Sequence, residues 1–211
     1  MLVLVGSPLL GGAAWQPVAS LLDAAVVTPA GGSAAEVLAS LLAQVPDEPG
    51  LVLVPHSNAG LYAAAVAAER DVRAVVFVDA GIPAADGPTP TAPAQALGFL
   101  GGIADEDGIL PPWTRWWPEE DVAALFPDAA ARSAVEADQP RLPLSYFSDA
   151  VPPAPLEMPC AYLAFGETYA EEVARATASG WPVSRLDGRH LHLLVDPAAV
   201  AAEIRRLAAL L

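Results

Sequence analysis

Short, continuous runs of valine, leucine and alanine recur along the chain, and longer segments with helical periodicity separate them. Six runs predict strands that are buried on both faces: Leu2–Val5, Ala24–Thr28, Leu51–Val54, Ala74–Val78, Ala161–Phe165 and Val183–Leu186. Five segments predict helices: Trp15–Leu22, Ala34–Gln44, Asn58–Glu69, Glu171–Ser179 and Pro197–Leu211. Strands that alternate with helices are typical of an α/β fold, here a mostly parallel sheet of about six strands with helices on both faces.

The alternation stops between about residues 84 and 158. This stretch holds more than half of the 22 prolines and three of the five tryptophans, and its predicted helices, Glu119–Leu125 and Asp128–Asp138, are short. We therefore expect one domain, residues 1–211, in which the stretch is a small cap insertion between two strands of the sheet. The chain is expected to return to the sheet at Pro159-Cys160.

Composition excludes several classes of chemistry. The formal net charge is −15, and all ten basic residues are arginine. Without lysine the chain cannot form a Schiff base, attach pyridoxal phosphate or build a phosphate-binding P-loop. A strongly acidic surface also argues against nucleic acid as a partner, because phosphate contacts need clustered basic side chains.

The expected location is the cytoplasm. The apolar segment after Met1 lacks the basic residues of a signal peptide, and no apolar run reaches the ~18–20 residues that a membrane helix needs. The one cysteine, Cys160, cannot form a disulfide framework within the chain, and a free thiol fits a reducing compartment.

A serine stands where a predicted buried strand gives way to a predicted helix. Ser57 follows the strand Leu51–Val54 and precedes Asn58, where the helical pattern begins. Such a position is typical of a nucleophile elbow, in which a strained turn exposes the hydroxyl and the helix N-terminus faces a developing oxyanion. The alternative is a serine that only caps the helix. The neighbouring His56 is expected to point away from the corner and to be structural.

A second candidate lies near the other end of the chain. His190 falls between the last predicted strand and the C-terminal helix, and a loop position lets a catalytic imidazole reach a serine. His192 is close by, but the two side chains cannot face the same way if the backbone is extended there. We favour His190, which follows Gly188-Arg189; the alternative is a surface histidine.

Four segments resemble motifs of the α/β-hydrolase superfamily, in the small branch of plant methylesterases, hydroxynitrile lyases and bacterial esterase-like relatives. Residues 2–22 (LVLVGSPLLGGAAWQPVASLL) resemble the opening strand and oxyanion loop, and residues 55–60 (PHSNAG) resemble the G-H-S-x-G-G elbow. Residues 75–87 (VVFVDAGIPAADG) and 186–204 (LDGRHLHLLVDPAAVAAEI) resemble the sixth-strand segment and the histidine loop. The resemblance implies a serine nucleophile, a histidine base, and no cofactor or metal.

The carboxylate that would orient His190 has two possible sources. The usual site in the family follows the strand Ala161–Phe165, where Glu167 is the nearest carboxylate, whereas some relatives, such as certain haloalkane dehalogenases, use the place where Asp79 stands. We favour Asp79, because it ends the strand after the nucleophile's strand and helix and should lie beside Ser57. Glu167 is the alternative acid. Each has a structural explanation too, Asp79 as a turn cap and Glu167 in a first helical turn.

The oxyanion loop departs from the family pattern. Aligned without gaps, the position of the family's donor is Pro8, which has no N–H, and losing one donor costs an acyl-transfer enzyme roughly 100–1,000-fold in rate. We expect the N–H of Asn58 as one donor, and the N–H of Leu9 or the hydroxyl of Ser7 as the substitute.

Three tryptophans in the proline-rich stretch, Trp113, Trp116 and Trp117, are candidates to line an apolar substrate pocket. The alternative is that they fasten the cap to the body.

Together these residues predict a serine hydrolase that acts on a small apolar ester, thioester or lactone. One alternative is a non-hydrolytic enzyme of the same fold, a lyase, a cyclase or a catalyst of rearrangement of a natural-product intermediate, because Pro8 weakens the oxyanion site. Another is a non-catalytic module that binds a small molecule. In each case the expected partner is a small molecule, not a nucleic acid or a membrane, and the sequence leaves the oligomeric state open.

Overall fold

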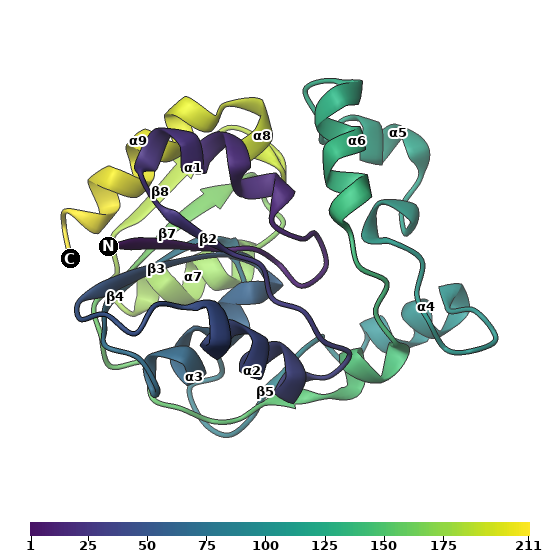
Figure 1. Ribbon diagram of the computed structural model, residues 1–211, viewed down its shortest axis with the longest axis horizontal. Helices are drawn as coiled ribbons and strands as arrows, with labels where there is room; N and C mark the ends of the chain where they lie inside the picture. Colours follow the sequence, from purple (N-terminus) through teal and green to yellow (C-terminus); the bar gives the residue numbers. More distant parts are fainter.

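Six parallel strands run through the body of the molecule in the computed structural model, which describes residues 1–211 (Figure 1). Their order across the sheet is β2-β1-β3-β4-β7-β8, so the two longest strands, β3 and β4, lie at its centre. The strands are β1 Leu2–Val5, β2 Ala25–Val27, β3 Leu51–Ser57, β4 Val72–Ala80, β7 Cys160–Phe165 and β8 Val183–Leu186. The prediction of a parallel six-stranded sheet is confirmed.

Helices cover both faces of this sheet, as Figure 1 shows. On one face lie α1 Gln16–Leu22, α8 His192–Val195 and α9 Pro197–Ala208, and on the other lie α2 Ala34–Gln44, α3 Ala63–Ala67 and α7 Ala170–Ala178. Two of them begin at the residues that capping rules favour. Ser33 Oγ accepts the Glu36 N–H at 3.2 Å, and Asp196 Oδ1 accepts the Ala199 N–H at 2.9 Å, with Pro197 in the first turn.

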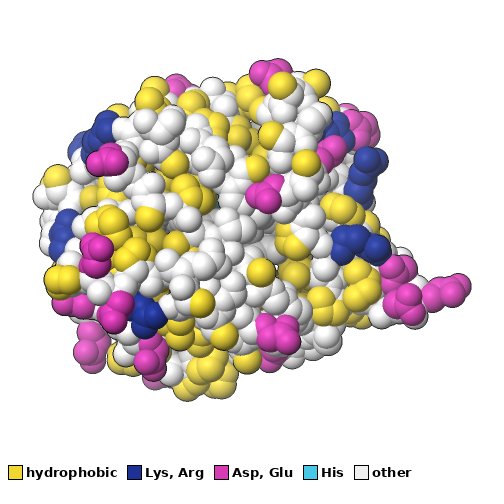
Figure 2. Space-filling model, viewed as in Figure 1, with side chains coloured by type: hydrophobic (Ala, Val, Ile, Leu, Met, Phe, Trp, Pro, Cys, Tyr) yellow, Lys and Arg dark blue, Asp and Glu magenta, His cyan; other side chains and the backbone are white.

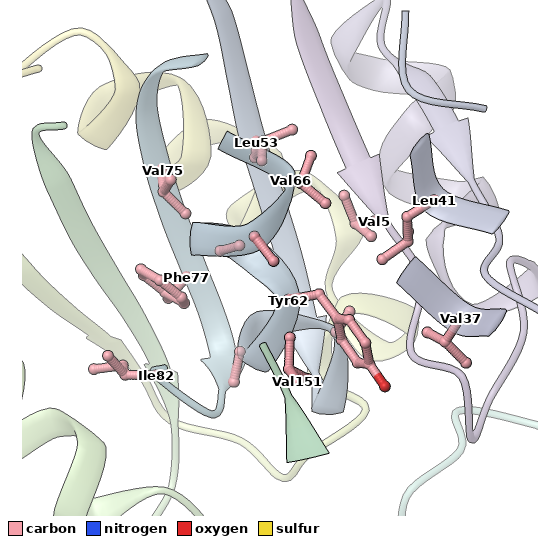
Figure 3. Close-up of a cluster of buried hydrophobic side chains, with 14 of the residues drawn as sticks. Val5, Val37, Leu41, Leu53, Tyr62, Val66, Val75, Phe77, Ile82 and Val151 are labelled. Carbon is pink, nitrogen blue, oxygen red and sulfur yellow. The ribbon is translucent and has the colours of Figure 1, made fainter. Parts of the chain in front are cut away.

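Alternate side chains of the central strands enter two separate layers of core. Figure 3 shows the layer beneath α2 and α3, where Leu53, Val75 and Phe77 meet Val66 and Leu41. The intervening side chains of the same strands pack beneath α1 and α9. Because both faces are buried, the strands read in the sequence as continuous apolar runs.

The predicted helix Asn58–Glu69 is wrong in its form. The segment begins as a 3-10 helix, η2 Asn58–Tyr62, and only Ala63–Ala67 is α-helical. Its first turn lies hard against the end of β4, where a Cβ on Gly60 would stand 2.1 Å from the Gly81 carbonyl oxygen. That close approach accounts for the glycine and brings the serine corner next to β4.

The chain leaves the sheet after β4 and returns to it at β7, and no strand of the main sheet lies between. The intervening elements are α4 Ala96–Ile103, η3 Trp113–Arg115, α5 Glu119–Ala123, α6 Ala129–Asp138, η4 Leu144–Ser148 and a small antiparallel pair, β5 Thr89–Pro90 with β6 Ala150–Val151. In Figure 1, α4, α5 and α6 stand to one side of the body. The helices at α5 and α6 were predicted; α4 and the β5–β6 pair were not. The assignment of residues 84–158 as a cap stays a prediction, and we call them the cap segment.

Polar contacts fasten the cap segment to the body. Asp138 Oδ2 accepts the N–H groups of Gly12 and Ala13 at 2.7 and 2.8 Å. The Tyr146 hydroxyl donates to Asn58 Oδ1 at 2.5 Å, and Asn58 Nδ2 donates to the Thr91 carbonyl at 2.8 Å. The side chain that follows Ser57 is therefore held by the cap segment.

Acidic side chains are spread over the face seen in Figure 2, and a group of them marks the tip of the loop after α4, Asp105-Glu106-Asp107. None of the helices has both the length and the apolar character to cross a membrane.

Candidate active site

Ser57 occupies a strained corner at the end of β3. Its φ is 58° and its ψ is −131°, and the residue is only 4% exposed. A non-glycine residue in this conformation costs of order 1–3 kcal/mol and is found mostly at functional sites. Its side chain makes no capping bond to η2. The corner thus has the geometry expected of a nucleophile elbow, not that of a simple helix cap.

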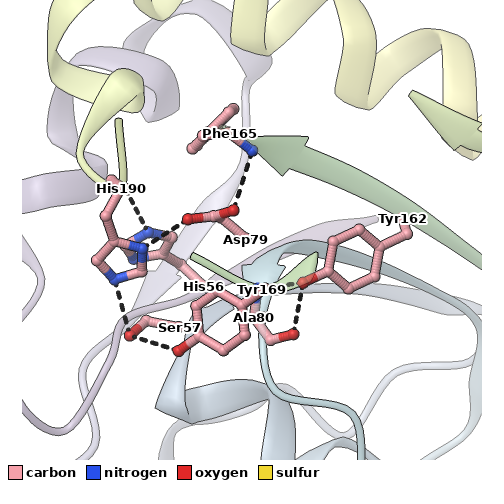
Figure 4. A network of polar contacts seen from close by, with 8 residues as sticks. All are labelled: His56, Ser57, Asp79, Ala80, Tyr162, Phe165, Tyr169 and His190. Carbon is pink, nitrogen blue, oxygen red and sulfur yellow. Dashed lines mark hydrogen bonds and ion pairs between the residues drawn. The ribbon is translucent and has the colours of Figure 1, made fainter. Parts of the chain in front are cut away.

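His190 links Ser57 to Asp79. Its Nε2 lies 3.0 Å from Ser57 Oγ, and its Nδ1 lies 2.7 Å from Asp79 Oδ2 (Figure 4). An ionised carboxylate can only accept, so Nδ1 carries a proton and Nε2 is the acceptor in the neutral ring. The Ser57 hydroxyl then donates to Nε2. This is the arrangement a serine needs in order to lose its proton to a histidine.

The structure places Asp79, and not Glu167, against His190. Asp79 is fully buried at the end of β4, and its second oxygen, Oδ1, accepts the Phe165 N–H at 2.9 Å. Both oxygens are therefore bonded, which offsets the cost of burying the charge. The Glu167 side chain is 83% exposed and pairs with Arg185 at 3.6 Å. The alternative prediction, that Glu167 contacts His190, is therefore wrong. The catalytic role of Asp79 stays a prediction.

His56 lies behind the ring of His190. It stacks on His190 with ring centroids 4.6 Å apart, and its Nε2 donates to the His190 carbonyl at 3.1 Å. Burial, together with the nearby charge of His190, holds the pKa of His56 well below its ordinary value. The structural role predicted from the sequence agrees with this placement, although the direct contact with His190 was not foreseen. His56 stays neutral and supports the loop that carries His190.

Protein stability is expected to fall below about pH 6.5 because of His56. An unfolded histidine binds a proton below a pKa of about 6.5, whereas folded His56 stays unprotonated, so the unfolded state holds more protons and stability rises with pH up to that value. Between pH 7.5 and 5.5, His56 alone should cost about 1.4 kcal/mol of unfolding free energy. Urea unfolding at both pH values measures this. His56→Gln should lack this part of the pH dependence, and an unchanged dependence in the variant would contradict the assignment.

Tyr169 is the site residue that the sequence analysis missed. Its hydroxyl lies 3.4 Å from Ser57 Oγ, and its ring centroid is 5.7 Å from that of His190. It comes from the turn between β7 and α7, which ends at the same edge of the sheet as β3. The only signal in the sequence was an aromatic residue two positions beyond Glu167, in the segment searched for an acid.

Two cavities lie close to the pair of Ser57 and His190. The first, about 510 Å³, we call the Asn58 cavity; its lining includes Asn58, Leu61, Ile82, Leu97, Phe147 and Tyr169. The second, about 450 Å³, we call the Trp113 cavity; its lining includes Trp113, Trp117, Leu125, Phe165, Glu167 and His190. Each has a mostly apolar wall and a few charged groups, and each reaches a residue next to Ser57.

Two of the three candidate tryptophans line a cavity. Trp113 and Trp117 face the Trp113 cavity, and the Trp113 ring lies 5.9 Å from that of His190. Trp116 lines neither cavity: its Nε1 donates to the Pro111 carbonyl at 2.8 Å, and its ring packs edge-on against Phe147. The prediction of a pocket role for Trp116 is wrong, because the short η3 turn directs its ring into the cap segment.

One of the two alternative donors in the loop after β1 is already engaged in another bond. The Leu9 N–H donates to Ser7 Oγ at 3.2 Å, so that N–H is already used. Pro8 lines a different cavity, near Asp138 at the junction with the cap segment. The remaining candidates from the sequence are the Asn58 N–H, at the start of η2, and the buried Ser7 hydroxyl, which still has its own proton to donate. No group of three or more His, Cys, Asp or Glu side chains is arranged to hold a metal ion.

A parallel sheet in the order β2-β1-β3-β4-β7-β8, a serine on a positive-φ corner after β3 and a histidine in the loop after β8 define the α/β-hydrolase fold. Comparison with solved structures agrees. An extracellular α/β-hydrolase from a Paenibacillus species, described as sharing structural and functional homology with tobacco salicylic acid binding protein 2, matches with a TM-score of 0.75 and 17% identity over 98% of both chains.

Two further structures extend this similarity. Polyneuridine aldehyde esterase matches with a TM-score of 0.68 and 14% identity over 98% of both chains. A methylesterase from Arabidopsis matches with a TM-score of 0.62 and 18% identity over 100% of this chain and 99% of that one. No family model matches the sequence, and no curated protein matches it. The likeness therefore establishes the fold, and the chemistry has to be argued from the site.

Proposed function

We propose that this protein is a serine hydrolase that cleaves a small, apolar ester, thioester or lactone. The observation that carries the proposal is the chain of hydrogen bonds from Ser57 Oγ to His190 Nε2, at 3.0 Å, and from His190 Nδ1 to Asp79, at 2.7 Å. Ser57 and His190 are 133 residues apart in the sequence, so only the fold brings them together. The names of the similar structures, an esterase and a methylesterase among them, describe those proteins and add support.

The reaction follows from the direction of each proton. Ser57 Oγ attacks the carbonyl carbon while its proton passes to His190 Nε2, and Asp79 stabilises the resulting imidazolium. The carbonyl oxygen takes up the electron pair and is stabilised by the Asn58 N–H and the Ser7 hydroxyl. His190 then protonates the leaving oxygen or sulfur, which leaves an acyl group on Ser57. Water, deprotonated by the same histidine, releases the acid.

The walls of the two cavities indicate the substrate. Their apolar lining suits acyl and alcohol groups of a few carbons. Each cavity also holds two carboxylates and one guanidinium: Asp149, Glu172 and Arg175 in the Asn58 cavity, and Asp121, Glu167 and Arg189 in the Trp113 cavity. Because acidic groups outnumber basic ones in both, an ester that carries a carboxylate should be a poor substrate.

An assay with p-nitrophenyl esters tests this function. We expect hydrolysis of the butyrate, and a kcat/KM for the similarly sized hemisuccinate that is lower by about tenfold or more, because a like charge within ~4 Å costs over 1 kcal/mol at a protein surface. Release of p-nitrophenol measures both, with heat-denatured protein as the blank.

Rates no higher than the blank for every neutral ester would contradict hydrolysis. In that event the arrangement of Ser57 and His190 would serve a lyase or cyclase, or a pocket that only binds. A hemisuccinate rate equal to the butyrate rate would contradict the argument from cavity charge alone.

A further inference from the structure

We propose that the Tyr169 hydroxyl is an oxyanion donor, which takes the place of the N–H missing at Pro8. This inference rests on the proposed hydrolase function and adds a catalytic residue to it. It starts from one contact: Tyr169 Oη is the second hydrogen-bond partner of Ser57 Oγ, at 3.4 Å, beside His190 (Figure 4).

The direction of the Tyr169 bond is fixed by the count of protons. Asp79 accepts from His190 Nδ1, so Nε2 accepts from Ser57, and the single Ser57 proton is used in that bond. Ser57 Oγ has lone pairs left and no second proton. The bond at 3.4 Å therefore has Tyr169 as donor and Ser57 as acceptor.

The hydroxyl keeps its proton at every working pH. Burial raises the pKa of Tyr169 well above its ordinary value, and the negative charges of Asp79 and Glu172 raise the pKa further, while the bond to Ser57 opposes them. A neutral phenol held in place by the fold is a fixed dipole, which is what stabilises charge that develops in a transition state.

The Asn58 cavity places Tyr169 together with the other expected donor. Asn58 and Tyr169 both line this cavity, whereas Pro8 belongs to the separate cavity near Asp138. A substrate carbonyl that enters the Asn58 cavity would therefore have both Asn58 and Tyr169 in the wall around it. Pro8 leaves the loop after β1 without a backbone N–H at the expected position, and Tyr169, in the turn after β7, supplies a further donor.

The chemical step balances without any further group. The Ser57 Oγ–carbon bond forms, the π pair of the carbonyl moves to its oxygen, and the Ser57 proton goes to His190. Once Oγ has spent a lone pair on the new bond, it is a poorer acceptor. The Tyr169 O–H turns from Oγ to the oxyanion attached to the same carbon, and it retains its proton throughout.

Tyr169→Phe tests the proposal, because it removes the hydroxyl and keeps the ring. We expect kcat for p-nitrophenyl butyrate to fall about 100–1,000-fold, the loss typical of one oxyanion donor, while KM changes by less than about threefold. A short alkyl trifluoromethyl ketone, which forms a tetrahedral oxyanion on the serine, should bind more weakly by the same factor as kcat/KM falls.

Tyr62→Phe is the matched control. It also removes one hydroxyl bond, the 3.0 Å contact with Tyr146, but Tyr62 makes no hydrogen bond to Ser57 or His190. It should lower the thermal midpoint and leave kcat within about twofold. A Tyr169→Phe protein with unchanged kcat, or with a lower kcat but unchanged affinity for the ketone, would overturn the proposal. An inactive wild-type protein would instead overturn the hydrolase function on which it rests.

Discussion

Ser57→Ala should lower kcat for p-nitrophenyl butyrate by up to about a million-fold, the loss seen when a serine protease loses its nucleophile. Alanine cannot form the acyl bond, and the remaining rate comes from binding and from the oxyanion donors alone. The measurement is p-nitrophenol release with protein in excess over substrate, so that a slow first turnover is still seen.

The strained backbone supplies a control for folding. Ser57 has a φ of 58°, so Ser57→Gly relieves strain of order 1–3 kcal/mol and should make the protein more stable while it is equally inactive. A loss of activity in a variant more stable than the wild type cannot be ascribed to unfolding. Retention of more than about one-hundredth of wild-type kcat in either variant would show that Ser57 is not the nucleophile.

Asp79→Asn should lower kcat about 10,000-fold, as in a serine protease whose triad acid becomes an amide. Both Asp79 oxygens accept hydrogen bonds, one from His190 and one from the Phe165 N–H. An asparagine has one oxygen and one NH₂, so it satisfies one of the two donors and turns the NH₂ toward the other. If the NH₂ faces His190, the imidazole takes the wrong tautomer and Nε2 no longer accepts the Ser57 proton.

The fold should survive this change. Asp79 has a φ of 41°, a region that asparagine tolerates better than most residues. Glu167→Gln is the matched control, since Glu167 is an exposed carboxylate next to the same site, and it should change kcat by less than about tenfold. If the ranking of the two variants were reversed, Glu167 would be the acid. If both variants kept a near-wild-type kcat, neither carboxylate would take part in the mechanism through His190.

Strands were the easiest elements to predict. Leu2–Val5 and Val183–Leu186 have the predicted bounds, because a strand buried between two helical layers needs an unbroken apolar run. The helix Ala34–Gln44 also has its predicted bounds, and the side chain of Ser33 marks its start. These signals are local, and the residues that carry them are adjacent in the sequence.

Elements that depend on distant contacts were missed. The helix α4 has the sequence ALGFLGGI, and its three glycines in eight residues give it a low helix propensity. The β5–β6 pair joins two-residue strands about sixty residues apart, and neither strand carries a sequence signal that predicts the pairing. The 3-10 form of η2 likewise goes with the close approach to Gly81, which only the folded chain shows.

The residues of the candidate site likewise fall into those that the sequence predicted and those that it did not. Ser57, Asp79 and His190 were found because each follows a predicted strand, and the carboxyl ends of parallel strands meet at one edge. Tyr169 was not found because its contact with Ser57 spans 112 residues and belongs to no motif. The wrong prediction for Trp116 has a similar cause. The sequence identifies a segment rich in aromatic residues, but it does not indicate which way each ring points.

Labelling with a fluorophosphonate tests the central claim most directly, because this probe forms a covalent bond only with a serine whose proton is drawn away by a base. Mass spectrometry of the digested protein should find one phosphonyl group per chain, on the peptide that contains Ser57, and Asp79→Asn should slow the labelling. Folded protein that stays unlabelled, or that carries the label on another residue, would contradict the account.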